Sequence, residues 1–168
     1  VSFYKGKDER SKIKGTIIAG LKLDFISSLI ISLILFFGAN YISLNIFHTD
    51  KLIPLLKLFA FLIPITTFGS IFQASIEGFQ KVKYTTIIRN FSESSTQTIL
   101  TLSLLLLGMG IFGAALGYFV AVTSSAILLF IVLQKKVYPL IGTKIKAIMN
   151  YRELIYYSLP LLLLSIMN

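Results

Sequence analysis

Four long apolar segments alternate with short polar connectors along this chain. They cover roughly Phe25–Phe47, Leu52–Ile76, Phe91–Leu107 and Ile111–Leu133, and a fifth segment begins near Leu154. Each complete segment has the length of about 17–25 residues that a helix needs to cross the hydrocarbon core of a bilayer. Strand-type alternation is absent, and lipid offers no partner to free backbone groups, so helices are expected. The pattern predicts an all-α, polytopic transmembrane helix bundle.

Positively charged residues gather in every second connector. The segment 1–14 and the connectors 77–90 and 134–153 are basic, whereas His48–Lys51 and Gly108–Gly110 contain a single Lys between them. Cationic loops are retained on the cytoplasmic side of a membrane. We therefore expect 1–14, 77–90 and 134–153 in the cytoplasm of a multi-pass protein of the cell (plasma) membrane.

The composition supports a membrane protein and argues against several other classes. Hydrophobic residues make up 55% of the chain and the mean hydropathy is +0.83, which is too apolar for a soluble domain. The net charge of +9 lies in connectors that face anionic lipid, so we expect no nucleic-acid partner. The chain has no Cys and one His, and we expect neither a metal site nor a cofactor.

The sequence favours transport over catalysis. It contains no Ser-His-Asp set and no Walker-type phosphate loop, so we expect that the protein is not an enzyme. Short connectors and polar positions within helices are what a carrier needs.

Three parts are expected along the chain. Residues 1–133 form four helices of an N-terminal transmembrane bundle, 134–153 a basic cytoplasmic linker, and 154–168 the start of the first helix of a second bundle. The chain opens within a connector and ends within an apolar segment, so we expect an internal piece of a larger membrane protein. Pro64 falls in the middle of the second segment and is expected to kink it.

Polar side chains inside the apolar segments are the candidates for substrate binding. Charges at membrane depth are costly and face protein or a water-filled cavity. Glu93 heads a polar row with Gln97 and Thr101, whereas the other charged candidates have an alternative role at the membrane surface. The candidate substrate-binding residues are Asp24, Lys57, Gln73, Arg89, Asn90, Glu93 and Gln97.

Small residues recur every four positions in the fourth segment. Gly113, Gly117, Ala121 and Ser125 share one helix face and allow a second helix backbone to approach closely. This row predicts a packing seam, and a contact with substrate is the alternative.

Several stretches resemble one family of transporters. The stretch 73–90 (QASIEGFQKVKYTTIIRN) resembles the helix end, basic loop and helix start of polysaccharide flippases in the multidrug/oligosaccharidyl-lipid/polysaccharide exporter superfamily. The run 104–117 (LLLLGMGIFGAALG) is similar to that family's glycine-bearing hairpin. Residues 158–163 (SLPLLL) look like the start of the helix that opens the second half, and residues 4–8 (YKGKD) like the loop before the third helix. The resemblance spans the whole chain, as helices three to six and part of helix seven.

The resemblance implies two six-helix bundles around a central cavity, in a MATE-like fold with alternating access. Its members flip polyprenyl-pyrophosphate-linked sugars from the inner to the outer leaflet, so the implied partners are a lipid-linked oligosaccharide and membrane lipids. On this view Arg89 and Lys57 hold the pyrophosphate, the amide candidates contact sugar hydroxyls, and the carboxylate candidates sense a coupling ion, Na+ or H+.

Two other functions remain open at the level of sequence. A cation-coupled multidrug exporter of the same superfamily would need a strong set of acidic ligands and a more apolar cavity. A membrane glycosyltransferase or polymerase would need a large loop outside the membrane with Arg, His or Asp.

Overall fold

The structure, a computed structural model, describes residues 10–139. Every regular element in this range is helical, and short π-helical segments (η1, η3, η4) and one 3-10 segment (η2) extend or join the α-helices. The expected helix start at 154–168 and most of the linker 134–153 lie outside the described residues. In chain order the elements are α2 (Arg10–Tyr41), η1 (Ile42–Ile46), η2 (Asp50–Leu52), α3 (Ile53–Gly78), α4 (Val82–Thr86), η3 (Ile87–Glu93), α5 (Ser94–Leu106), α6 (Gly110–Val132) and η4 (Leu133–Val137).

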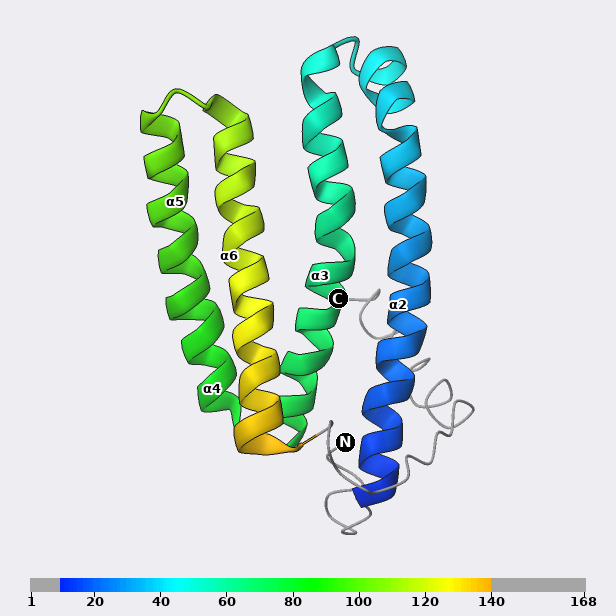
Figure 1. The fold of residues 1–168 in the computed structure, drawn as a ribbon, viewed down its shortest axis with the longest axis vertical. Coiled ribbons are helices and arrows are strands. Elements are labelled where there is room, and N and C mark those ends of the chain that lie inside the picture. Colours follow the sequence, from blue (N-terminus) through cyan, green and yellow to red (C-terminus); the bar gives the residue numbers. More distant parts are fainter. Residues whose placement is uncertain (1–9, 140–168) are drawn as a thin grey trace, which may run out of the picture.

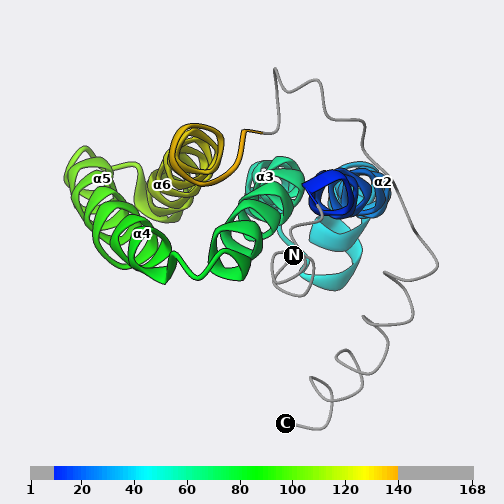
Figure 2. The ribbon, with the colours of Figure 1, turned by 90° about the horizontal axis from the view of Figure 1, so that it is seen from below.

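The helices form two antiparallel hairpins. One pairs α2 with α3, and the other pairs α5 with α6 (Figure 1). The hairpins meet where α3 packs against α6, which gives the spatial order α2, α3, α6, α5 that Figure 2 shows from below. This arrangement confirms the predicted all-α helix bundle.

Three of the four predicted spans have the length and apolar composition to cross a membrane. The third segment, in α4, η3 and α5, is helical but does not meet this standard, because its first half carries Arg89, Glu93 and many hydroxyl side chains. Among the described residues the candidate spans are Ile13–Ile46, Asp50–Gly78 and Gly110–Val137.

The first helix begins much earlier than its apolar segment. The sequence assigns 1–14 to a basic connector that leads into the helix and starts the apolar segment near Phe25, whereas α2 already begins at Arg10. Ile13 and Ile17 lie four residues apart on one helix face and are 3% and 2% exposed. Their burial against the other helices explains why the helix continues through a basic stretch.

Pro64 lies inside α3 without ending it. Proline has no amide proton, so the carbonyl of Ala60, one turn earlier, loses its helical hydrogen-bond partner. The Ser32 hydroxyl of α2 donates to that carbonyl at 2.7 Å, and both residues are buried. An unpaired carbonyl is costly in lipid, so α2 satisfies the gap that proline leaves and is held against α3 at this point.

We expect Ser32→Ala to destabilise the bundle by about 1 kcal/mol, a typical value for a hydrogen bond between membrane helices. The loss should largely disappear when Pro64 is also replaced by alanine, because the new amide at position 64 then bonds the Ala60 carbonyl. Melting temperatures of the four proteins in detergent give this coupling as a double-mutant cycle. Ser28→Ala is the control, since the buried Ser28 hydroxyl bonds only the Phe25 carbonyl of its own helix. Equal losses in both backgrounds would contradict the assignment.

The predicted row of small residues forms the contact between α6 and α5. A Cβ atom on Gly117 would lie 2.8 Å from Thr101 Oγ1 and 2.9 Å from the Thr101 backbone nitrogen. A Cβ atom on Gly113 would lie 3.0 Å from the Cβ atom of Leu104. The two later members of the row are also buried, which confirms the packing seam.

A glycine turn closes this hairpin. Gly108 and Gly110 have φ angles of +80° and +55°, in the left-handed region that glycine enters without steric cost. The amides of Gly108 and Met109 donate to the carbonyls of Leu105 and Leu104, which satisfies the last turn of α5.

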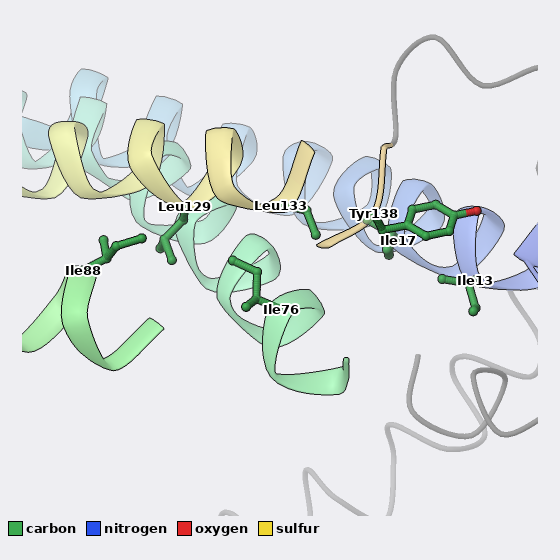
Figure 3. Packing of buried hydrophobic residues seen from close by; sticks show 7 residues of the cluster. All are labelled: Ile13, Ile17, Ile76, Ile88, Leu129, Leu133 and Tyr138. Atoms are coloured by element: carbon green, nitrogen blue, oxygen red, sulfur yellow. The ribbon is translucent and has the colours of Figure 1, made fainter. Parts of the chain in front are cut away.

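Elements from both hairpins meet in one apolar cluster at the end of the bundle that carries the basic connectors (Figure 3). Next to it, the Phe79 ring stacks on Tyr138 with 5.6 Å between centroids, and Lys81 Nζ donates to the Lys136 carbonyl. These contacts fix the two hairpins to each other at this end. The cluster, called the basal cluster below, contains Ile13, Ile17, Ile76, Ile88, Leu129, Leu133 and Tyr138.

Candidate functional site: a polar pocket among the membrane helices

A polar cavity lies between α3, η3 and α6 and has a volume of about 190 Å³. A single water needs only roughly 10–15 Å³, so this cavity, called the polar pocket below, has room for a ligand group. It brings together two of the seven candidate residues, Arg89 and Glu93. Its lining residues are Thr66, Gly69, Ser70, Arg89, Glu93, Tyr118, Val122, Ser125, Ala126 and Leu129.

Two of the three elements that line the pocket, α3 and α6, belong to candidate membrane spans. Arg89 follows Lys83 by six residues, and Ser125 precedes Lys135 by ten. At a rise of about 1.5 Å per residue, the pocket is roughly 10–15 Å from the basic end. A polar cavity at this depth is where a carrier would hold a group that lipid excludes.

Arg89 reaches the pocket from a π-helical segment. Its Nε atom is buried and has no hydrogen-bond partner among the described residues. Nearly all buried polar atoms in proteins are hydrogen-bonded, and π-helical turns are frequent at functional sites. An unpaired guanidinium nitrogen therefore marks Arg89 as the leading candidate for ligand binding.

The serine and threonine hydroxyl groups of the pocket divide into two kinds. Thr66 Oγ1 donates to the Ile63 carbonyl at 2.8 Å, and Ser70 Oγ donates to the Thr66 carbonyl at 3.0 Å, so both serve their own helix. Ser125 is 2% exposed, and its Oγ has no hydrogen-bond partner in the described part of the chain. Ser125 thus joins Arg89 as a second buried group without a partner.

Asn90 and Gln97 lie on the same helical stretch as Arg89 but do not line the pocket. Asn90 is exposed and Gln97 is half-buried. Glu93 is the last residue of η3, and the rest of its polar row runs along the α-helix α5 to Thr101, which lies against Gly117. The row therefore continues from the pocket toward the contact between α5 and α6, and only its first member lines the pocket.

The other three candidates lie elsewhere on α2 and α3. Lys57 Nζ is 5.4 Å from the centroid of the Phe36 ring, and Gln73 Nε2 donates to Glu77 Oε1 at 2.8 Å within α3. Asp24 is half-buried on α2. The structure does not bring these residues to the polar pocket, and no group of three His, Asp or Glu side chains that could hold a metal occurs within 10–139.

The sequence profile of proteins described as polysaccharide biosynthesis protein matches residues 7–168. The chain belongs to the polysaccharide biosynthesis protein family. No curated protein and no solved structure shows significant similarity to this family member. Together with the three candidate spans, the family indicates a polysaccharide-related membrane transporter.

Four polar pocket residues of this polysaccharide biosynthesis protein were not among the candidates, namely Thr66, Ser70, Tyr118 and Ser125. Ser125 was placed in the packing seam, although it is the one member of that row with a polar side chain. Thr66, Ser70 and Tyr118 gave no signal, because an apolar sequence does not show which face of its helix lines a cavity. The sequence does contain a signal for Ser125. It is the one hydroxyl residue in a row of Gly and Ala, so the packing seam becomes polar at this position.

A second cavity of this family member is apolar and has a volume of about 540 Å³. It lies between α2, α3 and α6 and shares Ala126 with the polar pocket. A Cβ atom on Gly69 would lie 3.5 Å from Ala126 Cβ, so the α3–α6 contact separates the two cavities. The apolar cavity is lined by Ile18, Leu21, Ile65, Phe68, Phe72, Thr123, Ala126, Ile127 and Phe130.

Proposed function

We propose that this chain is part of a membrane transporter that flips lipid-linked oligosaccharide from the cytoplasmic to the outer leaflet for surface polysaccharide biosynthesis. Membership of the polysaccharide biosynthesis protein family supports this proposal. The observation that carries it is the polar pocket between the helices, with the unpaired Nε atom of Arg89. The polyprenyl-pyrophosphate sugar is the proposed substrate, and transport rather than bond chemistry is the proposed activity.

The proposal follows from the cost of moving a polar headgroup through hydrocarbon. A pyrophosphate-linked sugar cannot enter the bilayer core without losing its hydration, whereas its lipid chain is already soluble there. Polar groups on a face between helices replace that hydration. A second, MATE-like bundle facing this one, with alternating access, would complete the path.

The same proposal places the basal cluster and its basic connectors on the cytoplasmic side of the plasma membrane. Lys81 and Lys136 come from connectors far apart in the sequence and bond each other at one end of the bundle. Lys14 lies in the first turns of α2, between Ile13 and Ile17 of the same basal cluster. Cations retained on one side are the expected pattern for cytoplasmic loops.

Single cysteines will report this orientation, because the chain has no Cys of its own. We expect a membrane-impermeant maleimide to label His48→Cys and Met109→Cys on intact cells. Lys83→Cys and Lys135→Cys should react only after the membrane is permeabilised. All four positions are exposed, so differences in labelling reflect the side of the membrane. Labelling of Lys83→Cys and Lys135→Cys from opposite sides would contradict the proposed topology.

The function is tested in a strain that lacks its own flippase for lipid-linked sugars. We expect the full-length protein to restore surface glycan, with membrane insertion verified by immunoblot. Drug susceptibility measured in the same strain separates the multidrug exporter, which would lower drug accumulation without restoring glycan. A correctly inserted protein that restores no glycan in strains with matching sugar chemistry would refute the proposal.

A further inference from the structure

We propose that the polar pocket binds a phosphate ester whose alcohol part carries hydroxyl groups. Arg89 and Ser125 donate to the phosphoryl oxygens, and Glu93 accepts a hydrogen bond from a neighbouring hydroxyl. This assignment rests on the proposed function and names a sugar phosphate as the part of the substrate that the pocket takes.

Two buried donors in the pocket lack an acceptor. They are Arg89 Nε from η3 and Ser125 Oγ from α6, and each is without a partner among residues 10–139. The hydroxyls of Thr66 and Ser70 are already used by carbonyls of α3. Buried donors are nearly always paired. Two unpaired donors that reach one cavity from different elements therefore indicate a ligand rich in acceptor oxygens.

A phosphoryl group fits this pair of donors. The guanidinium group presents its N–H donors in a planar fork that matches two oxygens of a phosphate. A phosphoryl group also has a further oxygen for the Ser125 hydroxyl. A cationic or purely apolar ligand would leave both donors unpaired.

Glu93 further restricts which chemical groups the ligand can carry. It lines the same pocket, and an ionised carboxylate only accepts hydrogen bonds and repels a bare anion nearby. A ligand that suits both Arg89 and Glu93 therefore carries hydroxyl donors beside its negative charge. A sugar phosphate has both, as does the headgroup of phosphatidylglycerol, so the experiment distinguishes these two sources.

The test is the binding of glucose 1-phosphate to the full-length protein in phosphatidylcholine nanodiscs, followed by saturation-transfer NMR. Glucose 1-phosphate should bind more tightly than inorganic phosphate or methyl glucoside. Arg89→Ala should weaken binding by about 10- to 100-fold and Ser125→Ala by about fivefold, as expected for hydrogen bonds to charged and neutral groups. Lys83→Ala is the matched control, because it removes an exposed cation from the same helical stretch outside the pocket. It should bind as the wild type does.

Glu93→Gln tests the second half of the assignment. Without the negative charge, inorganic phosphate should bind about three- to tenfold more tightly, since repulsion between like charges is removed. The preference for glucose 1-phosphate over inorganic phosphate should narrow accordingly. An unchanged preference would remove Glu93 from the site.

Melting temperatures separate a binding role of Arg89 from a structural one. Because its Nε has no partner, Arg89→Ala should leave the melting temperature of the ligand-free protein unchanged or raise it. Arg89→Lys keeps the charge without the planar fork and should restore part of the affinity. Equal binding by wild type and Arg89→Ala, or an equal loss in Lys83→Ala, would overturn the proposal.

Two further results assign the ligand and keep the two proposals separate. If phosphatidylglycerol in the nanodisc displaces glucose 1-phosphate only when Arg89 is present, the pocket takes bilayer headgroups and the sugar assignment falls. A protein that binds glucose 1-phosphate but restores no surface glycan keeps the binding site and loses the flippase function. A protein that restores glycan equally well with Arg89→Ala keeps the function and loses the binding site.

Discussion

Leucine in place of Gly117 will prevent α5 and α6 from packing, and the full-length protein should not be recovered as a monodisperse species. A Cβ atom at this position already lies 2.8 Å from Thr101 Oγ1 and 2.9 Å from the Thr101 backbone nitrogen. A side-chain atom can rotate away, but the backbone of a neighbouring helix moves only if the helices separate. Size-exclusion chromatography after solubilisation measures the result.

Alanine gives a graded version of the same test. We expect Gly117→Ala to cost about 1–3 kcal/mol, the usual range for overpacking in a tight contact. Gly20→Ala is the matched control, because a Cβ atom on Gly20 meets nothing within 4 Å. Alanine is favoured over glycine inside a helix by roughly 0.5–1 kcal/mol, so the control should raise the melting temperature slightly. Equal shifts for both variants would show that α5 and α6 are not held by this contact.

The packing seam could be predicted from spacing alone, but its partner and its end could not. Residues four apart share a helix face whatever the helix packs against, so the row from Gly113 to Ser125 was visible in the sequence. That Gly117 meets Thr101 depends on how α5 returns from the turn at Gly108. That Ser125 ends in a pocket depends on α3, which approaches α6 at Gly69.

From the sequence, Pro64 predicts a kink but not which residue satisfies the carbonyl that proline leaves without a partner. A missing amide proton is a property of the sequence, and its effect on the carbonyl one turn earlier follows from helix geometry. The partner that satisfies this carbonyl is Ser32, 28 residues earlier on another helix. Only the register between α2 and α3 determines this pairing, and hydrophobic patterning does not fix such a register to within one residue.

The candidate substrate-binding residues show the same limit of prediction from sequence. Charge and depth singled out Arg89 and Glu93, and both line the polar pocket. Lys57 is also a charged residue within an apolar segment, but it lies against the Phe36 ring and not in the pocket. The row from Glu93 to Gln97 does share a face of α5, but that face continues toward the contact of Thr101 with Gly117, and how far the pocket extends along it depends on α3 and α6.

Leu129 and Leu128 are neighbours on α6 with the same side chain and opposite surroundings. Leu129 is 0% exposed in the basal cluster, whereas Leu128 is 37% exposed. Leu129→Ala should destabilise the bundle by about 2 kcal/mol, at the lower end of the range for buried leucines in soluble proteins. The lower end is expected because lipid is as apolar as leucine, so lost packing contributes to the cost and transfer to water does not.

The same reasoning predicts almost no effect for Leu128→Ala, since a side chain that faces lipid gives up few contacts with protein. Unfolding of the two variants in mixed micelles, with the denaturing detergent titrated, measures the difference. Leu129 and Arg89 both line the polar pocket, and Leu129 shares the basal cluster with Ile88 of η3. Leu129→Ala should therefore loosen η3 and weaken glucose 1-phosphate binding as well. Similar stabilities for the two variants would mean that the basal cluster does not hold the hairpins together. Every element that lines the pocket has one end in or next to that cluster. Without the cluster, no contact would hold Arg89 at its position in the pocket.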